Sequence, residues 1–69
     1  MTIGQSIKKA RKSRKLKQVE LAEKARVSPQ TISYWECDRI RPTIDLLICV
    51  ADVLDITLDE LVGRTAKNN

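Results

Sequence analysis

Residues 18–36, QVELAEKARVSPQTISYWE, constrain the fold more than any other part of this 69-residue chain. The first half intersperses apolar residues among charges, a pattern typical of a half-buried helix: Val19, Leu21, Ala22 and Ala25. Ser28 then offers an N-cap hydroxyl, and Pro29 stands at the first helical position, where its missing N–H costs nothing. The segment therefore predicts two short helices joined by a tight turn.

The second of these helices, from Pro29 to Glu36, has two chemically different sides. Successive residues turn by about 100°, and we take Ile32 as pointing inward. The same side then holds Ser28, Trp35 and Glu36. The opposite side holds only uncharged side chains that can hydrogen-bond: Gln30, Thr31, Ser33 and Tyr34. Such groups suit base edges better than phosphates, since Gln pairs bidentately with adenine. The simpler interpretation, a solvated face, is the commoner meaning of polar residues on a helix.

Charge is unevenly distributed along the chain, whose formal net charge is +4. Residues 1–17 carry seven basic side chains and no acid, residues 18–42 carry four of each sign, and residues 43–69 carry five acids against Arg64 and Lys67, which gives +7, 0 and −3. A basic first third favours binding to a polyanion, and an acidic last third is expected to face away from it. A solvated lysine-rich helix would explain the first block but not the gradient.

The composition argues against several classes of protein. No apolar run reaches the roughly 18 residues that a membrane span needs, and no hydrophobic signal core stands at the N-terminus. We therefore expect a soluble cytoplasmic protein without membrane association. Two cysteines, Cys37 and Cys49, and no histidine are too few ligands for a closed zinc site, and we expect no disulfide between them in a reducing compartment. Without histidine or a glycine-rich phosphate loop, the sequence predicts no enzyme, no cofactor and no small-molecule ligand.

Helix signals recur along the whole chain, whereas strand signals do not. Thr2 with Gln5 forms a capping box before a helix that ends near residue 13. Thr43 is the expected N-cap of a fourth helix ending near residue 54, and Thr57 with Glu60 forms a second capping box before a short fifth helix. The sequence thus predicts a compact all-α domain of five helices over residues 1–64, with residues 65–69 as a disordered tail.

Several motifs follow one another in a characteristic order. They are Ile3, Ile7, Arg11 and Leu16, then QxELA at 18–22, VSxQTISxWE at 27–36, Pro42, an apolar pattern over 44–54, and ITLDELV at 56–62. In this order they resemble the helix-turn-helix domain of the phage repressor and Cro family, also called the Xre family, over about residues 2–63. The resemblance implies a lambda-repressor-like fold with the helix-turn-helix in the second and third helices.

The resemblance also implies two kinds of DNA contact. The residues that would read bases in the major groove lie on the third helix: Gln30, Thr31, Ser33 and Tyr34. The residues that would contact the DNA backbone surround them: Lys17, Gln18, Ser28, Arg39 and Arg41. Pro29 takes a position where relatives often carry a base-reading side chain, which leaves only van der Waals contact there.

Other residues are implied to support the scaffold. The resemblance pairs Arg11 with Glu36, and we interpret this ion pair as structural because an unpaired carboxylate near the buried side would be costly. Trp35, beside an inward Ile32, is expected to pack in the core rather than to stack on a ligand.

Three turn positions depart from the family pattern. Lys15, Arg26 and Asp38 stand where relatives commonly have glycine, often because the backbone adopts a positive φ. A non-glycine residue loses roughly 1 kcal/mol in that conformation. Either the turns differ here or the domain tolerates modest strain.

The fourth helix is apolar nearly all round, because only Asp45 and Asp52 are polar between residues 44 and 54. Such a helix is normally buried on more than one side. The family pattern assigns to the core Ile44, Leu47, Val50, Ala51 and Leu54. This assignment leaves a second apolar stripe formed by Leu46, Cys49 and Val53. Together with Leu58 or Val62, this stripe could form a two-fold dimer interface. Alternatively, a small protein merely exposes a few aliphatic groups.

These features predict a sequence-specific double-stranded DNA-binding transcriptional regulator, a repressor that binds a near-palindromic operator as a homodimer with its third helix in the major groove. The alternative is a protein-interaction module, antitoxin-like or regulator-binding, that uses the apolar face of the fourth helix. An RNA-associated role is less favoured, because a rigid helix fits the major groove of B-form DNA better than the deep, narrow groove of RNA.

Overall fold

The computed structural model describes residues 2–62, and the helices in this range account for its regular secondary structure. They are α1 (Ile3–Ser13), α2 (Gln18–Ala25), α3 (Pro29–Glu36), α4 (Ile44–Leu54) and α5 (Leu58–Leu61). The predicted all-α class and the five predicted helices are confirmed within this range. The predicted tail at residues 65–69 and the last two residues of the predicted domain, 63 and 64, lie outside it.

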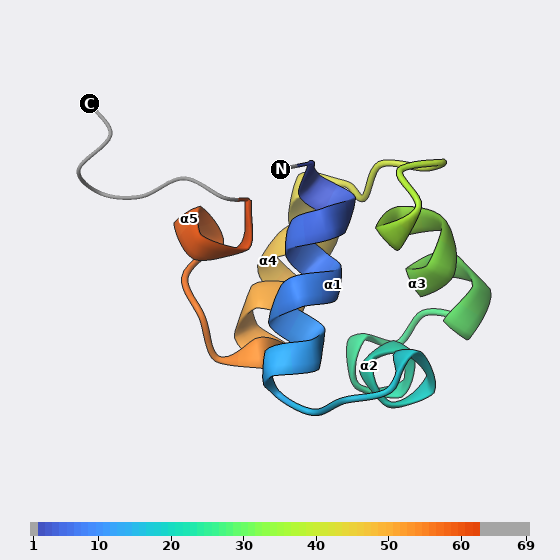
Figure 1. Ribbon diagram of the computed structural model, residues 1–69, viewed down its shortest axis with the longest axis horizontal. Helices are drawn as coiled ribbons and strands as arrows, with labels where there is room; N and C mark the ends of the chain where they lie inside the picture. The colour runs from blue at the N-terminus through green and yellow to red at the C-terminus, as the bar shows by residue number, and fades with distance from the viewer. Residues whose placement is uncertain (1, 63–69) are drawn as a thin grey trace.

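Helix α1 runs through the middle of the molecule (Figure 1). In that view α4 lies behind α1, α2 and α3 lie on one side, and α5 lies on the other. α1 packs on α3 and α5, α2 packs on α3 and α4, and α4 packs on α5. α3 is therefore held on its inner side by both α1 and α2.

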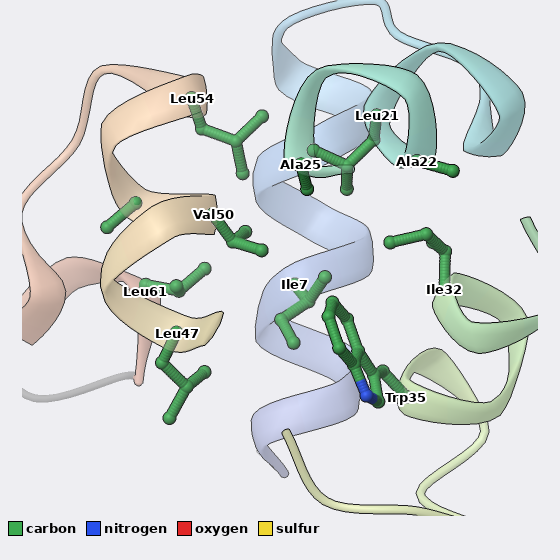
Figure 2. Close-up of a cluster of buried hydrophobic side chains, with 11 residues drawn as sticks. Ile7, Leu21, Ala22, Ala25, Ile32, Trp35, Leu47, Val50, Leu54 and Leu61 are labelled. Carbon is green, nitrogen blue, oxygen red and sulfur yellow. The ribbon is translucent and has the colours of Figure 1, made fainter. Parts of the chain in front are cut away.

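One hydrophobic core joins all five helices, and Figure 2 shows its side chains pointing into the space around α1. The largest fully buried side chains come from every helix: Ile7, Leu21, Ile32, Trp35, Val50, Leu54 and Leu61. Trp35 reaches from α3 toward α1 beside Ile7, as the core assignment predicted (Figure 2). Burying a large apolar side chain contributes about 1.5–3 kcal/mol, so this cluster is the main source of stability.

Four helices begin at a hydroxyl N-cap, and all four caps were predicted from the sequence: Thr2, Ser28, Thr43 and Thr57. Each side-chain oxygen accepts a hydrogen bond from the backbone N–H three residues later, which satisfies a donor that the helix itself leaves without a partner. The two predicted capping boxes are also complete, because the Gln5 and Glu60 side chains accept from the N–H groups of their caps.

Four turns adopt the left-handed backbone conformation without glycine: Lys15, Arg26, Asp38 and Asp55, with φ between 57° and 61°. After each, the next backbone N–H donates to the carbonyl five residues earlier, the bond that closes a Schellman-type helix end. Three of these positions are the glycine-less turns singled out from the resemblance, whereas Asp55 was not foreseen. The domain therefore adopts a positive φ at these turns without glycine and tolerates roughly 1 kcal/mol of strain at each turn.

Two burial predictions were wrong. Ser28 was placed on the buried side by the helical wheel but is exposed. As the N-cap it has extended rather than helical dihedral angles, so the wheel does not apply to it. Ile44 was assigned to the core but is 59% exposed. Side chains in a helix lean toward its N-terminus, so at the first position of α4 this side chain projects past the end of the helix.

Candidate nucleic-acid interface

The four residues predicted to read bases share the outer side of α3. Gln30 is exposed, and the other three are half-buried: Thr31, Ser33 and Tyr34. On the inner side, Ile32 is fully buried and Trp35 is nearly so. A three-residue turn, 26–28, connects α2 to α3, and the N–H of Val27 donates to the carbonyl of Ala22 at 3.0 Å within it. The outer side is thus presented by a helix whose orientation the core fixes.

Two of these outer side chains are joined to each other. The amide nitrogen of Gln30 donates to the hydroxyl of Tyr34 at 2.6 Å, one helical turn away. The guanidinium of Arg39 lies over the Tyr34 ring, with its central carbon 5.3 Å from the ring centroid, within cation–π range. Neither contact was predicted from the sequence. The i, i+4 spacing of Gln30 and Tyr34 was a signal for the first, whereas the second depends on the path of the loop.

The predicted partners Arg11 and Glu36 are brought together in a buried ion pair. The Arg11 Nε lies 2.7 Å from Glu36 Oε2, and its Nη2 donates to Oε1 at 3.1 Å, a bidentate arrangement. The Arg11 Nη1 donates to the carbonyl of Leu16 at 2.7 Å. The exposed fraction of the two side chains is only 9% and 3%, so this pair is shielded from water and fixes α1 against the end of α3.

Gln18, the predicted phosphate anchor, belongs to the same network. Its amide nitrogen donates to Glu36 Oε1 at 3.0 Å, and the side chain is half-buried at the start of α2. From the sequence, Gln18 and Glu36 were expected to have separate roles, Gln18 on DNA and Glu36 in the scaffold. The structure instead makes Glu36 the residue that orients Gln18, because one carboxylate oxygen accepts from both Gln18 and Arg11.

The loop after α3 is attached to the first turn of α1, and Figure 1 shows it passing the N-terminal end of that helix. Asp38 accepts from the backbone N–H of Gly4 at 3.0 Å and from the hydroxyl of Thr2 at 2.6 Å. Gly4 is buried, and a Cβ at its position would collide with the carbonyl oxygen of Trp35. α1 and the end of α3 therefore approach each other as closely as glycine permits.

The remaining residues predicted to contact the DNA backbone lie before α2, between α2 and α3, and in the loop after α3. Lys17, Arg39 and Arg41 are exposed, as is Ser28, whose hydroxyl lies 2.8 Å from that of Thr31. Of the seven basic side chains in residues 1–17, only Arg11 is buried. The exposed ones can interact with a polyanion: Lys8, Lys9, Lys12, Arg14, Lys15 and Lys17. Arg14 also donates to the carbonyl of Asp55 at 3.0 Å.

The stripe predicted to form a dimer interface is half-buried rather than free. Its residues pack against the edge of the protein's own core: Leu46, Cys49, Val53, Leu58 and Val62. The more exposed apolar residues of α4 are Ile44 and Ile48, at 59% and 45%, one helical turn apart. Only the outer edges of the predicted stripe are left for a second copy, and its use in a dimer stays a prediction.

Residues 2–62 contain neither a candidate membrane-spanning helix nor a candidate metal-binding cluster. None of the helices there is both long and apolar enough to cross a membrane. No group of three or more acidic, cysteine or histidine side chains in this range is arranged to hold a metal ion.

The chain is similar to known DNA-binding proteins over most of its length. The profile of the helix-turn-helix family matches residues 7–61. The immunity repressor protein of Bacillus phage phi105 is 48% identical over 64 residues, which are 93% of this chain and 44% of that protein. The transcriptional repressor RstR of the cryptic phage CTXphi of Vibrio cholerae is 32% identical over 68 residues, 99% of this chain and 61% of that protein. The chain thus spans less than two thirds of these relatives.

Solved structures share the same fold. The P22 c2 repressor in complex with a synthetic operator has a TM-score of 0.85 and 28% identity, and the similarity covers 94% of this chain and 98% of that one. SinR, described as a master regulator for biofilm formation and solved in complex with DNA, has a TM-score of 0.81 and 39% identity over 87% of this chain and 97% of that one. The five-helix arrangement is therefore one that both of these DNA complexes contain.

Proposed function

This chain belongs to the helix-turn-helix family, and from that premise we propose that it binds double-stranded DNA in a sequence-specific manner and represses transcription. The outer side of α3 carries this proposal. It offers uncharged hydrogen-bonding side chains on a helix whose inner side is fixed in the core. Two solved relatives with this fold are DNA complexes. α3 would enter the major groove, which is wide enough to admit a helix.

Within this proposal, the residues divide by the part of DNA that they contact. Base edges would be read by Gln30, Thr31, Ser33 and Tyr34. The phosphate backbone would be contacted by Lys17, Gln18, Ser28, Arg39 and Arg41, which set the position of α3 without reading sequence. The bond from Gln18 to Glu36 supports the backbone contact proposed for Gln18, because it holds the amide at the start of α2.

We further propose that the protein acts in the cytoplasm as a homodimer, with residues 1–64 as its DNA-binding domain. Two copies related by a two-fold axis would bind a near-palindromic operator whose half-sites lie about one helical turn apart. The interface would use the outer edge of the stripe on α4 and α5: Leu46, Cys49, Val53, Leu58 and Val62. Sedimentation that detects only monomer at high protein concentration would contradict the dimer.

The exposed pair Ile44 and Ile48 favours a second candidate function. In that alternative the chain is a protein-interaction module, antitoxin-like or regulator-binding, and the apolar face of α4 contacts another protein. Large apolar side chains exposed one turn apart are the usual anchors of a helix-mediated contact. The alternative needs no preference for any DNA sequence.

Selection of bound duplexes from a random DNA library at fixed salt separates the two candidates. We expect a near-palindromic sequence to be enriched, with an affinity well above that for random DNA. No gain in affinity after selection would contradict the proposal and favour the interaction module.

Two variants then locate the reading face on the selected duplex. Gln30→Ala should cost about 1–3 kcal/mol of binding free energy and relax preference at one base pair. Arg41→Ala is the matched control: it should weaken binding to all sequences alike and flatten the salt dependence by about one unit. If Gln30→Ala leaves the preferred sequence unchanged, the assignment of the reading face is wrong.

A further inference from the structure

We infer that Tyr34 determines sequence preference through Gln30, by holding the Gln30 amide in the orientation that reads adenine of an A·T base pair. This inference rests on the proposed function, since it concerns how α3 would read DNA. It changes the role given to Tyr34 from direct base contact to the positioning of a neighbour. The evidence is the bond between the two side chains and the contacts that restrain the Tyr34 ring.

The Gln30 side chain is exposed, so it would sample several rotamers if it had no partner. Its amide nitrogen instead donates to the Tyr34 hydroxyl at 2.6 Å. The Tyr34 ring is half-buried on α3, and the Arg39 guanidinium lies over it, 5.3 Å from the centroid. A restrained ring holds its hydroxyl in place, and the hydroxyl in turn holds the amide. Gln30 therefore loses less conformational freedom when it binds a base.

The chemistry of the amide connects this restraint to the identity of the base. A bidentate contact with adenine uses the amide oxygen, which accepts from N6, and the N–H on the same edge, which donates to N7. The amide nitrogen carries a second N–H, and this one can donate to Tyr34 without competing for the base. In the opposite amide orientation the hydroxyl would donate to the amide oxygen. The NH2 group alone would then face the groove and match the two acceptors of guanine, O6 and N7.

Arg39 helps to restrain the Tyr34 ring. It follows Asp38, whose carboxylate is bound to Thr2 and to the backbone of Gly4, so the loop that carries Arg39 is attached to α1. From this loop the guanidinium covers the Tyr34 ring. The loop after α3 thus supports the reading side chains in addition to supplying a charge near the phosphates.

The test compares base preferences for the wild type, Tyr34→Phe, Gln30→Ala and the double variant, each by selection from a random duplex library. Tyr34→Phe keeps the ring and its contact with Arg39 but removes the hydroxyl. We expect the wild type to prefer adenine at the base pair that Gln30→Ala identifies. In Tyr34→Phe this preference should fall about 2- to 10-fold, the range expected for the loss of one hydrogen bond. The salt dependence of binding should not change, because no cationic side chain is removed.

The double variant distinguishes positioning from direct contact. If Tyr34 acts through Gln30, adding Tyr34→Phe to Gln30→Ala should have no further effect at that base pair. If Tyr34→Phe instead alters preference at a different base pair, and adds to Gln30→Ala, then Tyr34 reads its own base and the inference is overturned. A preference of the wild type for guanine at the Gln30 position would also overturn it, as would an unchanged adenine preference in Tyr34→Phe.

These failures differ from failure of the proposed function. If the wild type enriches no sequence at all, the proposed function is overturned and this inference with it. If the wild type enriches a sequence and only the Tyr34 results disagree, the function stands and the positioning role is wrong. Circular dichroism of each variant serves as the control for folding, which Tyr34→Phe should leave unchanged because the hydroxyl contacts an exposed side chain.

Discussion

The two sides of α1 are held by contacts of different kinds. Toward α3 the core packing is joined by short polar contacts: the bidentate pair of Arg11 with Glu36, and the bonds from Thr2 and Gly4 to Asp38. On the side of α4 and α5 the buried residues are mainly apolar and belong to the common core, through side chains such as Val50, Leu54 and Leu61. Hydrogen bonds depend on distance and angle, whereas apolar burial is non-directional.

The two sides of α1 therefore have different roles, one in the stability of the domain and one in the position of α3. The apolar side contributes most of the free energy of folding but tolerates small shifts of one helix over another. The polar side fixes α3 relative to α1 and α2 and so sets the position of the side chains that we propose to read bases. Substitutions on the apolar side should therefore lower stability alone, whereas substitutions on the polar side should also alter DNA binding by the molecules that remain folded.

The largest effect is expected at the buried ion pair. Glu36→Ala leaves Arg11 buried without its carboxylate and should cost about 3–5 kcal/mol of unfolding free energy. Urea denaturation measures this loss, which is a large share of the roughly 5–15 kcal/mol that stabilises a typical domain. Glu36→Gln is the control, because it keeps the shape and an acceptor for Gln18. A loss below about 1 kcal/mol in Glu36→Ala would show that the pair is not what joins α1 to α3.

On the apolar side, Leu54→Ala should cost about 2–5 kcal/mol, because it removes a buried side chain and leaves a cavity. The folded fraction should nevertheless bind the selected duplex with unchanged affinity, since Leu54 lies on α4, away from the polar contacts of α3. Binding is measured at a temperature where the variant is fully folded. A marked drop in the affinity of folded Leu54→Ala would remove the distinction between the two sides.

Gly4→Ala tests the polar side by adding atoms rather than removing them. The new Cβ would collide with the Trp35 carbonyl and lie 2.7 Å from Asp38 Oδ1, so α1 and the end of α3 must move apart. We expect a stability loss of about 1–3 kcal/mol, as for overpacking elsewhere. Affinity for the selected duplex should fall in the folded protein as well, because α3 is displaced.

Ser6→Ala is the matched control in the same helix. The Ser6 hydroxyl is buried and has no hydrogen-bond partner among the described residues, so its removal should not lower stability. If Gly4→Ala and Ser6→Ala gave equal affinities, the close approach at Gly4 would have no part in positioning α3.

The smallest effect concerns the cap of α5. Hydrogen bonds from the backbone N–H and the hydroxyl of Thr57 lower the pKa of Glu60 from its ordinary value of 4.5. A lowered folded-state pKa means that the ionised carboxylate stabilises the fold above the unfolded pKa, and that this contribution is lost as pH falls through the folded pKa. The Glu60 side chain is fully exposed, so the effect should be small.

Thermal unfolding of the wild type and Glu60→Gln between about pH 6 and pH 3 measures this contribution. The difference in Tm between the two proteins should shrink as pH falls below 4.5. A difference that stays constant with pH would mean that ionisation of Glu60 does not stabilise α5. This would leave the apolar packing of Leu61 as the main contact holding the helix.

Contacts in the candidate site could be predicted from the residues themselves where the two partners lie close together along the chain. The outer side of α3 followed from helical spacing, and the capping residues followed from their distance of three residues to the groups they bind. The Gln30 to Tyr34 bond was also within reach of such reasoning, at one turn's separation. The pairing of Arg11 with Glu36 came only through the resemblance, because the two residues are 25 positions apart.

The sequence by itself therefore determined the five helices, the hydroxyl caps of four of them and the inward side of α3, since these depend on backbone geometry within about one helical turn. Only the tertiary structure decided that Asp38 binds the first turn of α1, that Glu36 orients Gln18, and that Ile44 projects into solvent. Those outcomes depend on how separate helices pack and where each one ends. No spacing along the chain specifies the distance between two elements that meet only through tertiary packing.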